Sequence, residues 1–352
     1  MLGNANNRIA SLDGLRAVAI LMVIFSHAAY TCHFPAVAPH IFYFFNGELG
    51  VRIFFVISGF IITHLLLREE NKGGEFSIKY FYVRRAIRIL PVYFTFLLVV
   101  YLIDRWLMVG IATNEFIAAA SFTTGWWNDS TWLLGHTWSL SVEEQFYLLW
   151  PLLLFLIKSK RLRCIATILL ILFFPVMRTI VYLSTLRDRM PYLFITQGDA
   201  ILMGCLLALF LYYEGERAKK WFISYVFLGR IAGVICIAAL NMLSGQRMAG
   251  WVTVPLLVSV QSMVIAWMIA SFIFNKDSGY SFLNSKVLVF LGTISYSWYL
   301  WQQVFLFACG RFFKGITFEF PGNLLCSFVI AVISYFLIEK TFLKLRNQWI
   351  KA

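Results

Sequence analysis

Apolar residues along this chain are gathered into long runs that short polar stretches separate. A helix needs about 20 apolar residues to cross the hydrocarbon core of a bilayer. Ten runs approach that length, and their approximate bounds are 15–33, 49–67, 90–107, 143–157, 164–185, 199–213, 222–243, 251–274, 287–309 and 323–339. No long linker or internal repeat divides them. The pattern therefore predicts an all-α, polytopic integral membrane protein with about ten transmembrane helices, in a single domain over residues 1–352.

Composition leads to the same class of protein and adds an orientation. The chain is 61% hydrophobic and 13% charged, with a net charge of +13. A basic chain can bind nucleic acid, but in so apolar a background short basic cytoplasmic loops explain the charge better. With the N-terminus inside, most of the 30 Lys and Arg residues fall on the inner face. We therefore expect both termini in the cytoplasm, and membrane lipid rather than nucleic acid as a partner.

The cysteines give no sign of a structural framework. There are six, at Cys32, Cys164, Cys205, Cys236, Cys309 and Cys326. None forms a CxxC pair and most lie in apolar runs, so we expect neither a disulfide framework nor a zinc site.

The segment "SLDGLRAVAILMVIFSH" at 11–27, which leads into the first run, contains an arginine and a histidine that a spanning helix seldom holds. In a helix, Arg16 and His27 would lie on one face, about 16 Å apart. Arg16 would then lie at the cytoplasmic rim, where it fits an anchor paired with Asp13 as well as it fits a binding role. His27 would lie about half-way across the core, where the cost of an ionisable group favours function over packing. Neutral histidine is the usual general base near neutral pH.

Four later segments carry recognisable motifs: "GELGVRIFFVISGFIIT" at 47–63, "FYVRRAIRILPVYF" at 81–94, "HTWSLSVEEQFYLLWP" at 136–151 and "GTISYSWYLWQQ" at 292–303. Together with the Arg16–His27 spacing they resemble, in the same order, the membrane-bound acyltransferase-3 family, whose members O-acetylate sugars and polysaccharides. The resemblance covers nearly the whole chain. Members often have His where Gln302 stands and Pro where Thr341 stands. Gln302 cannot supply a second base.

This resemblance implies an O-acetyltransferase of the bacterial inner membrane. The donor would be acyl-CoA, usually acetyl-CoA, and the acceptor a hydroxyl of a cell-envelope or exported glycan, free or lipid-linked. Acetyl-CoA would be a substrate, and no bound cofactor or metal is expected. Transfer of another acyl group, such as succinyl, stays open. A secondary transporter also stays open, since Arg and His within spans suit transport on physical grounds, although the two related halves common in transporters are not evident.

The basic cluster in the segment 81–94 is the candidate donor site. Arg84, Arg85 and Arg88 lie on the expected inner face, and guanidinium groups bind phosphates through charge-assisted hydrogen bonds. Anionic lipid is the alternative partner of such a cluster. The resemblance favours CoA, with Arg16 contacting its phosphates and its thin pantetheine arm reaching His27. His27 would act as a general base or become acylated itself.

The segment 136–151 supplies two carboxylates. Ser141 and Glu144 have the spacing of a capping box at the start of a helix. Adjacent helical residues point about 100° apart, so Glu143 and Glu144 cannot line the same pocket. We assign Glu143, with His27, to catalysis, where it would orient His27 or a substrate, and Glu144 to capping.

Four further residues are candidates for supporting roles. Ser58 either donates to a substrate or allows close helix packing, and packing is favoured. Trp138 belongs to a group of tryptophans that fits an interfacial belt better than sugar stacking. Tyr147 completes the motif at 136–151, and Asp199 is either a helix cap or a functional residue.

Overall fold

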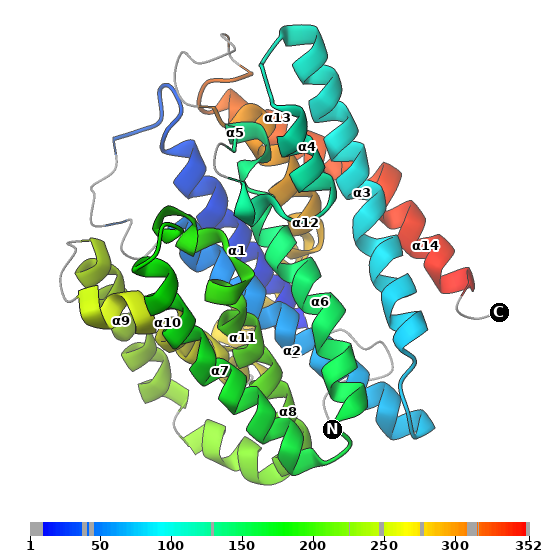
Figure 1. The fold of residues 1–352 in the computed structure, drawn as a ribbon, viewed down its shortest axis with the longest axis vertical. Helices are drawn as coiled ribbons and strands as arrows, with labels where there is room; N and C mark the ends of the chain where they lie inside the picture. Colours follow the sequence, from blue (N-terminus) through cyan, green and yellow to red (C-terminus); the bar gives the residue numbers. More distant parts are fainter. Residues whose placement is uncertain are drawn as a thin grey trace.

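The computed structural model describes residues 10–36, 41, 46–127, 130–224, 226–245, 250–274, 278–307, 315 and 317–349. Within these residues all regular structure is helical, which confirms the expected all-α class (Figure 1). The longer helices are α1 (Ala10–Ala28), α2 (Gly47–Gly73), α3 (Ile78–Leu107), α6 (Trp138–Leu156), α7 (Lys160–Tyr182), α8 (Phe194–Ser224), α9 (Val226–Gly245), α10 (Gly250–Phe274), α12 (Lys286–Phe305) and α13 (Gly322–Ser334). The shorter elements are α4 (Thr113–Ala120), η2 (Thr124–Trp126), α5 (Trp132–Gly135), η3 (Arg187–Tyr192), α11 (Ser278–Leu283), the π-helical turn η4 (Tyr335–Glu339) and α14 (Lys340–Trp349).

The predicted apolar runs fall mainly on the longer helices. Seven described stretches are long and apolar enough to cross a membrane: Ser11–Ala28, Gly47–Gly73, Ile78–Leu107, Lys160–Tyr182, Arg187–Gly215, Gly250–Phe274 and Gly322–Leu345. These stretches agree with a polytopic membrane protein. The other three runs lie on α6, α9 and α12, which are not among the seven. The number of spans and the cytoplasmic location of the termini therefore stay predictions.

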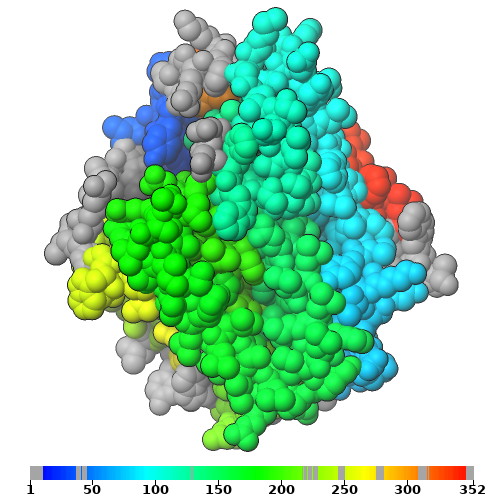
Figure 2. Space-filling view, in the orientation of Figure 1, coloured from blue at the N-terminus to red at the C-terminus, as the bar shows by residue number. Residues whose placement is uncertain are grey.

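The interior of the bundle is formed by α1, α2 and α8, and its periphery includes α3, α7 and α13. In the apolar stretches of the interior helices 61–72% of the residues are buried, against 28–33% in the peripheral ones. Figure 2 shows the face that α3, α6 and α7 build, in cyan to green, with α1 largely behind it. Leu102 and Trp106 on α3, and Leu169 and Leu172 on α7, are exposed. Such an apolar surface is suited to contact with lipid.

Close backbone contacts hold the helices that carry the predicted motifs. A Cβ atom at Gly59 of α2 would lie 1.9 Å from the carbonyl oxygen of Ile201 in α8. A Cβ atom at Gly292 of α12 would lie 1.8 Å from the carbonyl oxygen of Asp13 in α1. Small residues allow such contacts in membrane helix bundles. Any side chain at either position would force the two helices apart.

Helix α1 ends earlier than the predicted run 15–33. The chain turns after Ala28, where the Thr31 hydroxyl donates to the Ala28 carbonyl at 2.7 Å, and His33 has a φ of 61°. Hydropathy alone extended the run, because the residues of this turn include apolar side chains. His27 therefore lies in the last turn of α1, eleven residues after Arg16, and its expected depth in the membrane stays a prediction.

The turn after α1 also contains a disulfide-bonded cysteine, Cys32. Sequence spacing missed this bond because CxxC patterns report only cysteines that are close in sequence. The turn lies against a distant segment of the chain: the backbone N–H of Phe320 donates to the Cys32 carbonyl at 3.0 Å. His33 Nδ1 also lies 3.3 Å from the Glu319 carboxylate. The other described cysteines, Cys164, Cys205, Cys236 and Cys326, are free.

Candidate active site

A large cavity of about 1210 Å³ lies beside the C-terminal end of α1. We call it the large cavity. Its wall combines aromatic rings with hydroxyl, amide and guanidinium groups, and it includes His27, Phe55, Trp132, Trp138 and Tyr299. Trp138 is part of this wall, and its ring contacts Tyr192, with the ring centroids 5.5 Å apart. The choice between an interfacial belt and sugar stacking stays open for Trp138.

His27 lines the large cavity, and two neighbouring side chains contact its imidazole ring. Its Nδ1 atom lies 2.8 Å from Oε1 of Gln302 on α12. The Trp132 ring packs edge-on against the imidazole, with ring centroids 5.3 Å apart. A second histidine in the wall, His136, lies between α5 and α6, and burial lowers its pKa to about 3. His136 is therefore neutral at physiological pH.

A narrow pocket of about 80 Å³ lies deeper along α1, and we call it the narrow pocket. Arg16 from α1, Arg85 and Arg88 from α3, and Glu143 and Tyr147 from α6 line it. The predicted meeting of Arg16 with the basic cluster is thus present in the structure. Three guanidinium groups against one carboxylate give the pocket a positive balance, which favours a polyanionic ligand.

A chain of polar contacts crosses the narrow pocket. The Ser58 and Tyr147 hydroxyls are 2.5 Å apart, and the Tyr147 hydroxyl donates to Glu143 Oε2 at 3.1 Å. The Arg85 guanidinium lies 4.7 Å from the centroid of the Tyr147 ring. Ser58 lines this pocket, and Gly59 beside it makes the close helix contact. The two roles considered for Ser58, packing and donation to a substrate, stay predictions.

Arg84 was predicted to act with Arg85 and Arg88, but it lies elsewhere. Its Nη2 atom is 2.6 Å from the Glu69 carboxylate, and both side chains are about one-third exposed. Arg84 is not part of the wall of the narrow pocket. Consecutive helical residues differ by about 100° in direction, which explains why Arg84 and Arg85 face different surroundings.

The carboxylates of α6 correct two predictions. Because α6 begins at Trp138, Ser141 and Glu144 lie within the helix and form no capping box; the Ser141 hydroxyl donates to the Thr137 carbonyl at 3.1 Å. Glu143 lines the narrow pocket, whereas the hydrogen-bond partner of His27 is Gln302. Glu143 therefore does not orient His27, and its candidate role is contact with a substrate.

The two pockets share part of their walls. Val51 and Phe55 of α2 and Tyr299 of α12 line both of them, and we call these three side chains the neck. The Tyr299 hydroxyl lies 2.6 Å from the Ser139 hydroxyl and donates to the His136 carbonyl at 2.9 Å. A flexible ligand held at Arg16 would have to pass the neck to reach His27.

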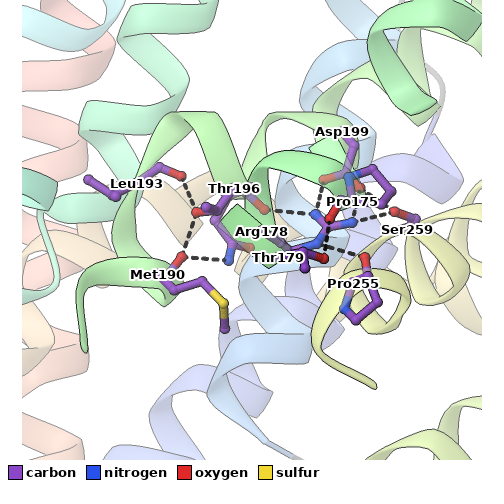
Figure 3. Close-up of polar contacts among 10 residues, drawn as sticks. Pro175, Arg178, Thr179, Met190, Leu193, Thr196, Asp199, Pro255 and Ser259 are labelled. Carbon is purple, nitrogen blue, oxygen red and sulfur yellow. Dashed lines mark hydrogen bonds and ion pairs between the residues drawn. The ribbon is translucent and has the colours of Figure 1, made fainter. Parts of the chain in front are cut away.

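Asp199 belongs to a buried ion pair next to the site (Figure 3). Its carboxylate accepts two hydrogen bonds from Arg178 of α7, each 2.9 Å long, and a third from Ser259 of α10 at 2.5 Å. Arg178 also donates to the carbonyls of Thr196 and Pro255. Asp199 lies inside α8, so the alternative of a helix cap is wrong. The cluster joins α7, α8 and α10.

Sequence reasoning missed Glu339 altogether. This buried residue closes the π-helical turn η4, accepts a hydrogen bond from Ser297 at 2.9 Å and acts electrostatically on Arg16 and Arg88. Asp13 also acts on the Arg16 charge, as expected for its neighbour on α1. The available signal was an acidic residue at the end of an apolar run. Within the described residues, no group of three His, Cys, Asp or Glu side chains is arranged to hold a metal ion.

Long apolar helices around an internal histidine and an arginine-lined pocket define a polytopic membrane protein with a ligand site inside its helix bundle. A family model described as an acyltransferase domain matches residues 9–340. The chain therefore belongs to the acyltransferase-3 family, as its motifs predicted.

Curated relatives support the same assignment. The O-acetyltransferase OatA of Staphylococcus aureus (strain NCTC 8325) is 28% identical over 355 residues, which cover 94% of this chain and 56% of that protein. The peptidoglycan O-acetyltransferase OatA of Listeria monocytogenes is 35% identical over 219 residues, which cover 57% of this chain and 33% of that protein. The chain thus spans about half the length, or less, of these relatives. No solved structure matches it.

Proposed function

We propose that this chain is an O-acetyltransferase that moves an acetyl group from acetyl-CoA to a hydroxyl of a cell-envelope glycan. The observation that carries the proposal is the pair of pockets that meet at the neck. One is narrow and lined by three arginines; the other is wide, aromatic and polar, and holds His27. The names of the relatives support O-acetyl transfer, and the Listeria relative supports peptidoglycan as the kind of acceptor.

The narrow pocket suits the donor. Arg16, Arg85 and Arg88 would bind the phosphates of CoA, and a hydrogen bond to a charged group contributes about 1.5–3 kcal/mol. The thin pantetheine arm would pass the neck and bring the thioester beside His27. Residues 16 and 27 are about 16 Å apart along α1, a distance that a long arm can span.

The large cavity suits a glycan. Trp132 and Trp138 present flat apolar rings, on which the C–H face of a sugar can pack. Polar side chains in the same wall would bind its hydroxyls and fix its orientation.

The two pockets would then serve opposite sides of the bacterial inner membrane. Basic residues gather toward the end of the bundle where Arg16 lies, which favours the cytoplasm for that end. The disulfide-bonded Cys32 lies past the other end of α1, and disulfides persist in oxidising compartments outside the cytoplasm. The acetyl group would cross the membrane inside the protein.

The chemistry follows from the position of His27. The acceptor oxygen attacks the thioester carbonyl carbon, and His27 takes the hydroxyl proton. The new C–O bond forms, the C–S bond breaks, and the CoA thiolate recovers the proton from His27. A positioned base of this kind contributes about 10²–10⁴-fold in rate.

Mass spectrometry of cell-envelope glycans tests this function. Cells that express the chain should carry glycans heavier by acetyl groups than cells that lack it, and the His27→Ala variant should not restore them. In purified form, the full chain should release CoA from acetyl-CoA when soluble peptidoglycan fragments are added. A folded protein that binds acetyl-CoA but transfers nothing to any envelope glycan would contradict the proposal and favour a transporter.

A further inference from the structure

The hydrogen bond between α1 and α12 points to a role for Gln302 in the chemistry of His27. We propose that Gln302 is a positioning residue: it fixes the tautomer of His27 so that the unprotonated Nε2 faces the acceptor in the large cavity. This inference rests on the proposed acyl transfer and adds to it a residue that acts through His27.

The geometry selects one tautomer. Gln302 Oε1 lies 2.8 Å from Nδ1 of His27, and a carbonyl oxygen can only accept a hydrogen bond. With the amide oxygen oriented toward the ring in this way, Nδ1 carries the proton. In a neutral imidazole the other nitrogen is then the proton acceptor, so Nε2 is free to act as the base.

The burial of Gln302 argues against a role in packing alone. The residue is fully buried, and its Nε2 atom has no hydrogen-bond partner. An unpaired buried donor costs about 1–3 kcal/mol, whereas an apolar side chain of similar shape avoids that cost. Stability alone would favour methionine or leucine at this position. The amide is explained by its contact with His27.

The helix packing brings Gln302 to this place. α12 touches the start of α1 at Gly292, opposite Asp13, and it continues alongside α1 to its last turn. The next residue, Gln303, points about 100° away and lines the large cavity. Gln302 therefore faces α1 while Gln303 faces the cavity.

Besides His27, the wall of the large cavity contains other ionisable groups. The pH-dependent event that matters for the rate is the titration of His27. His136, between α5 and α6, has a pKa of about 3 because of its burial, and it acts on His27 as a neutral group above that pH. Glu48 and Arg52 of α2 pair with each other at 2.9 Å, and Asp188 and Arg189 of η3 complete the charged residues in the wall of the large cavity.

The first test is the Gln302→Met variant of the full chain in detergent, with acetyl-CoA and soluble peptidoglycan fragments. We expect kcat to fall about 10–100-fold, a part of what a positioned base contributes. The KM for acetyl-CoA and the melting temperature should stay unchanged, or the melting temperature should rise. A structural role would instead lower the melting temperature and leave kcat near the wild-type value in the folded fraction.

The second test is the pH–rate profile of Gln302→Glu. The wild-type rate should rise with pH as His27 loses its proton. A carboxylate at hydrogen-bond distance stabilises the protonated imidazole, so the rise should move to higher pH by about one unit or more. A matched control is Asn323→Leu, which also replaces a fully buried amide with an unpartnered nitrogen, but in α13 and away from both pockets. Its profile should match that of the wild type.

Each result decides a different question. Full kcat in Gln302→Met, or an unshifted profile in an active Gln302→Glu variant, overturns the role of Gln302 while the wild-type activity keeps the proposed function. A wild-type protein without transfer activity refutes the proposed function itself.

Discussion

Arg16 and His27 of α1 have different neighbours, and the difference separates their proposed roles. Arg16 lies among two further arginines, Arg85 and Arg88, in the narrow pocket. His27 lies against Gln302 and Trp132 in the large cavity. Binding and chemistry are thus assigned to opposite ends of one helix.

Variants of these two residues should fail in different ways. His27→Ala should fold and bind acetyl-CoA but lose transfer by about 10²-fold or more, the contribution of a general base. Arg16→Lys keeps a positive charge but lacks the guanidinium fork, so donor affinity should drop while orientation in the membrane stays correct. Calorimetric binding of acetyl-CoA and initial rates measure both effects. Full activity in Arg16→Lys would reduce Arg16 to a topology anchor.

The basic cluster of α3 contains its own control. Arg88→Gln should raise the KM for acetyl-CoA about tenfold or more, because a charge-assisted hydrogen bond contributes about 1.5–3 kcal/mol. Arg84→Gln should leave that KM unchanged, because Arg84 pairs with Glu69 outside the narrow pocket. Equal KM values for the two variants in steady-state kinetics would indicate that the cluster binds lipid.

At the scale of elements, the contact of α1 with α12 places His27 beside Gln302. Gly292→Ala adds a Cβ atom that would lie 1.8 Å from the Asp13 carbonyl oxygen, so the helices must separate. We expect a lower melting temperature and a loss of kcat, although position 292 is distant from the chemistry. Gly73→Ala is the control, since no atom lies within 4 Å of its added Cβ. Normal activity in Gly292→Ala would show that this contact does not position the site.

The ion pair of α7 and α8 should matter for stability. Removing one partner of a buried pair typically costs about 3–5 kcal/mol, because the other charge stays buried and unpaired. Asp199→Ala should therefore unfold at a much lower temperature than the wild type. Replacing both partners, in Arg178→Met with Asp199→Leu, should restore part of the loss. If the double variant proves less stable than either single variant in thermal melts, the pair carries specific structure that apolar residues cannot replace.

The sequence predicted the helices better than it predicted which side chains contact one another. Hydropathy located the helices, and the two residues singled out by their spacing, Arg16 and His27, line the narrow pocket and the large cavity. The sequence did not predict which way side chains point in tertiary contacts. Glu143 lies with the arginines of the narrow pocket and not beside His27, and Ser58 lines the same pocket. Ser141 was misjudged because the N-cap of α6 is Thr137, four residues earlier than the motif suggested. Cys32 was misjudged because its surroundings come from a segment almost 300 residues away.

At the scale of the whole molecule, the orientation in the membrane can be measured. Tyr30→Cys, exposed past the far end of α1, should react with a membrane-impermeant thiol reagent added to intact cells. Lys72→Cys, exposed in the last turn of α2, should react only after the membrane is opened. The expected result follows from the excess of basic residues at the cytoplasmic end. The reverse labelling pattern would refute the orientation and the donor route.

The neck has a consequence for the cell that holds this protein. Under the proposed function the two pockets would open toward opposite sides of an energised membrane, where each elementary charge that crosses 100 mV dissipates about 2.3 kcal/mol. Val51, Phe55 and Tyr299 stand where a leak of protons or sodium would begin. With no donor bound, these side chains would have to close the path between the pockets; with a donor bound, the pantetheine arm would fill it. A wider neck would then let ions leak across the membrane and lower its potential.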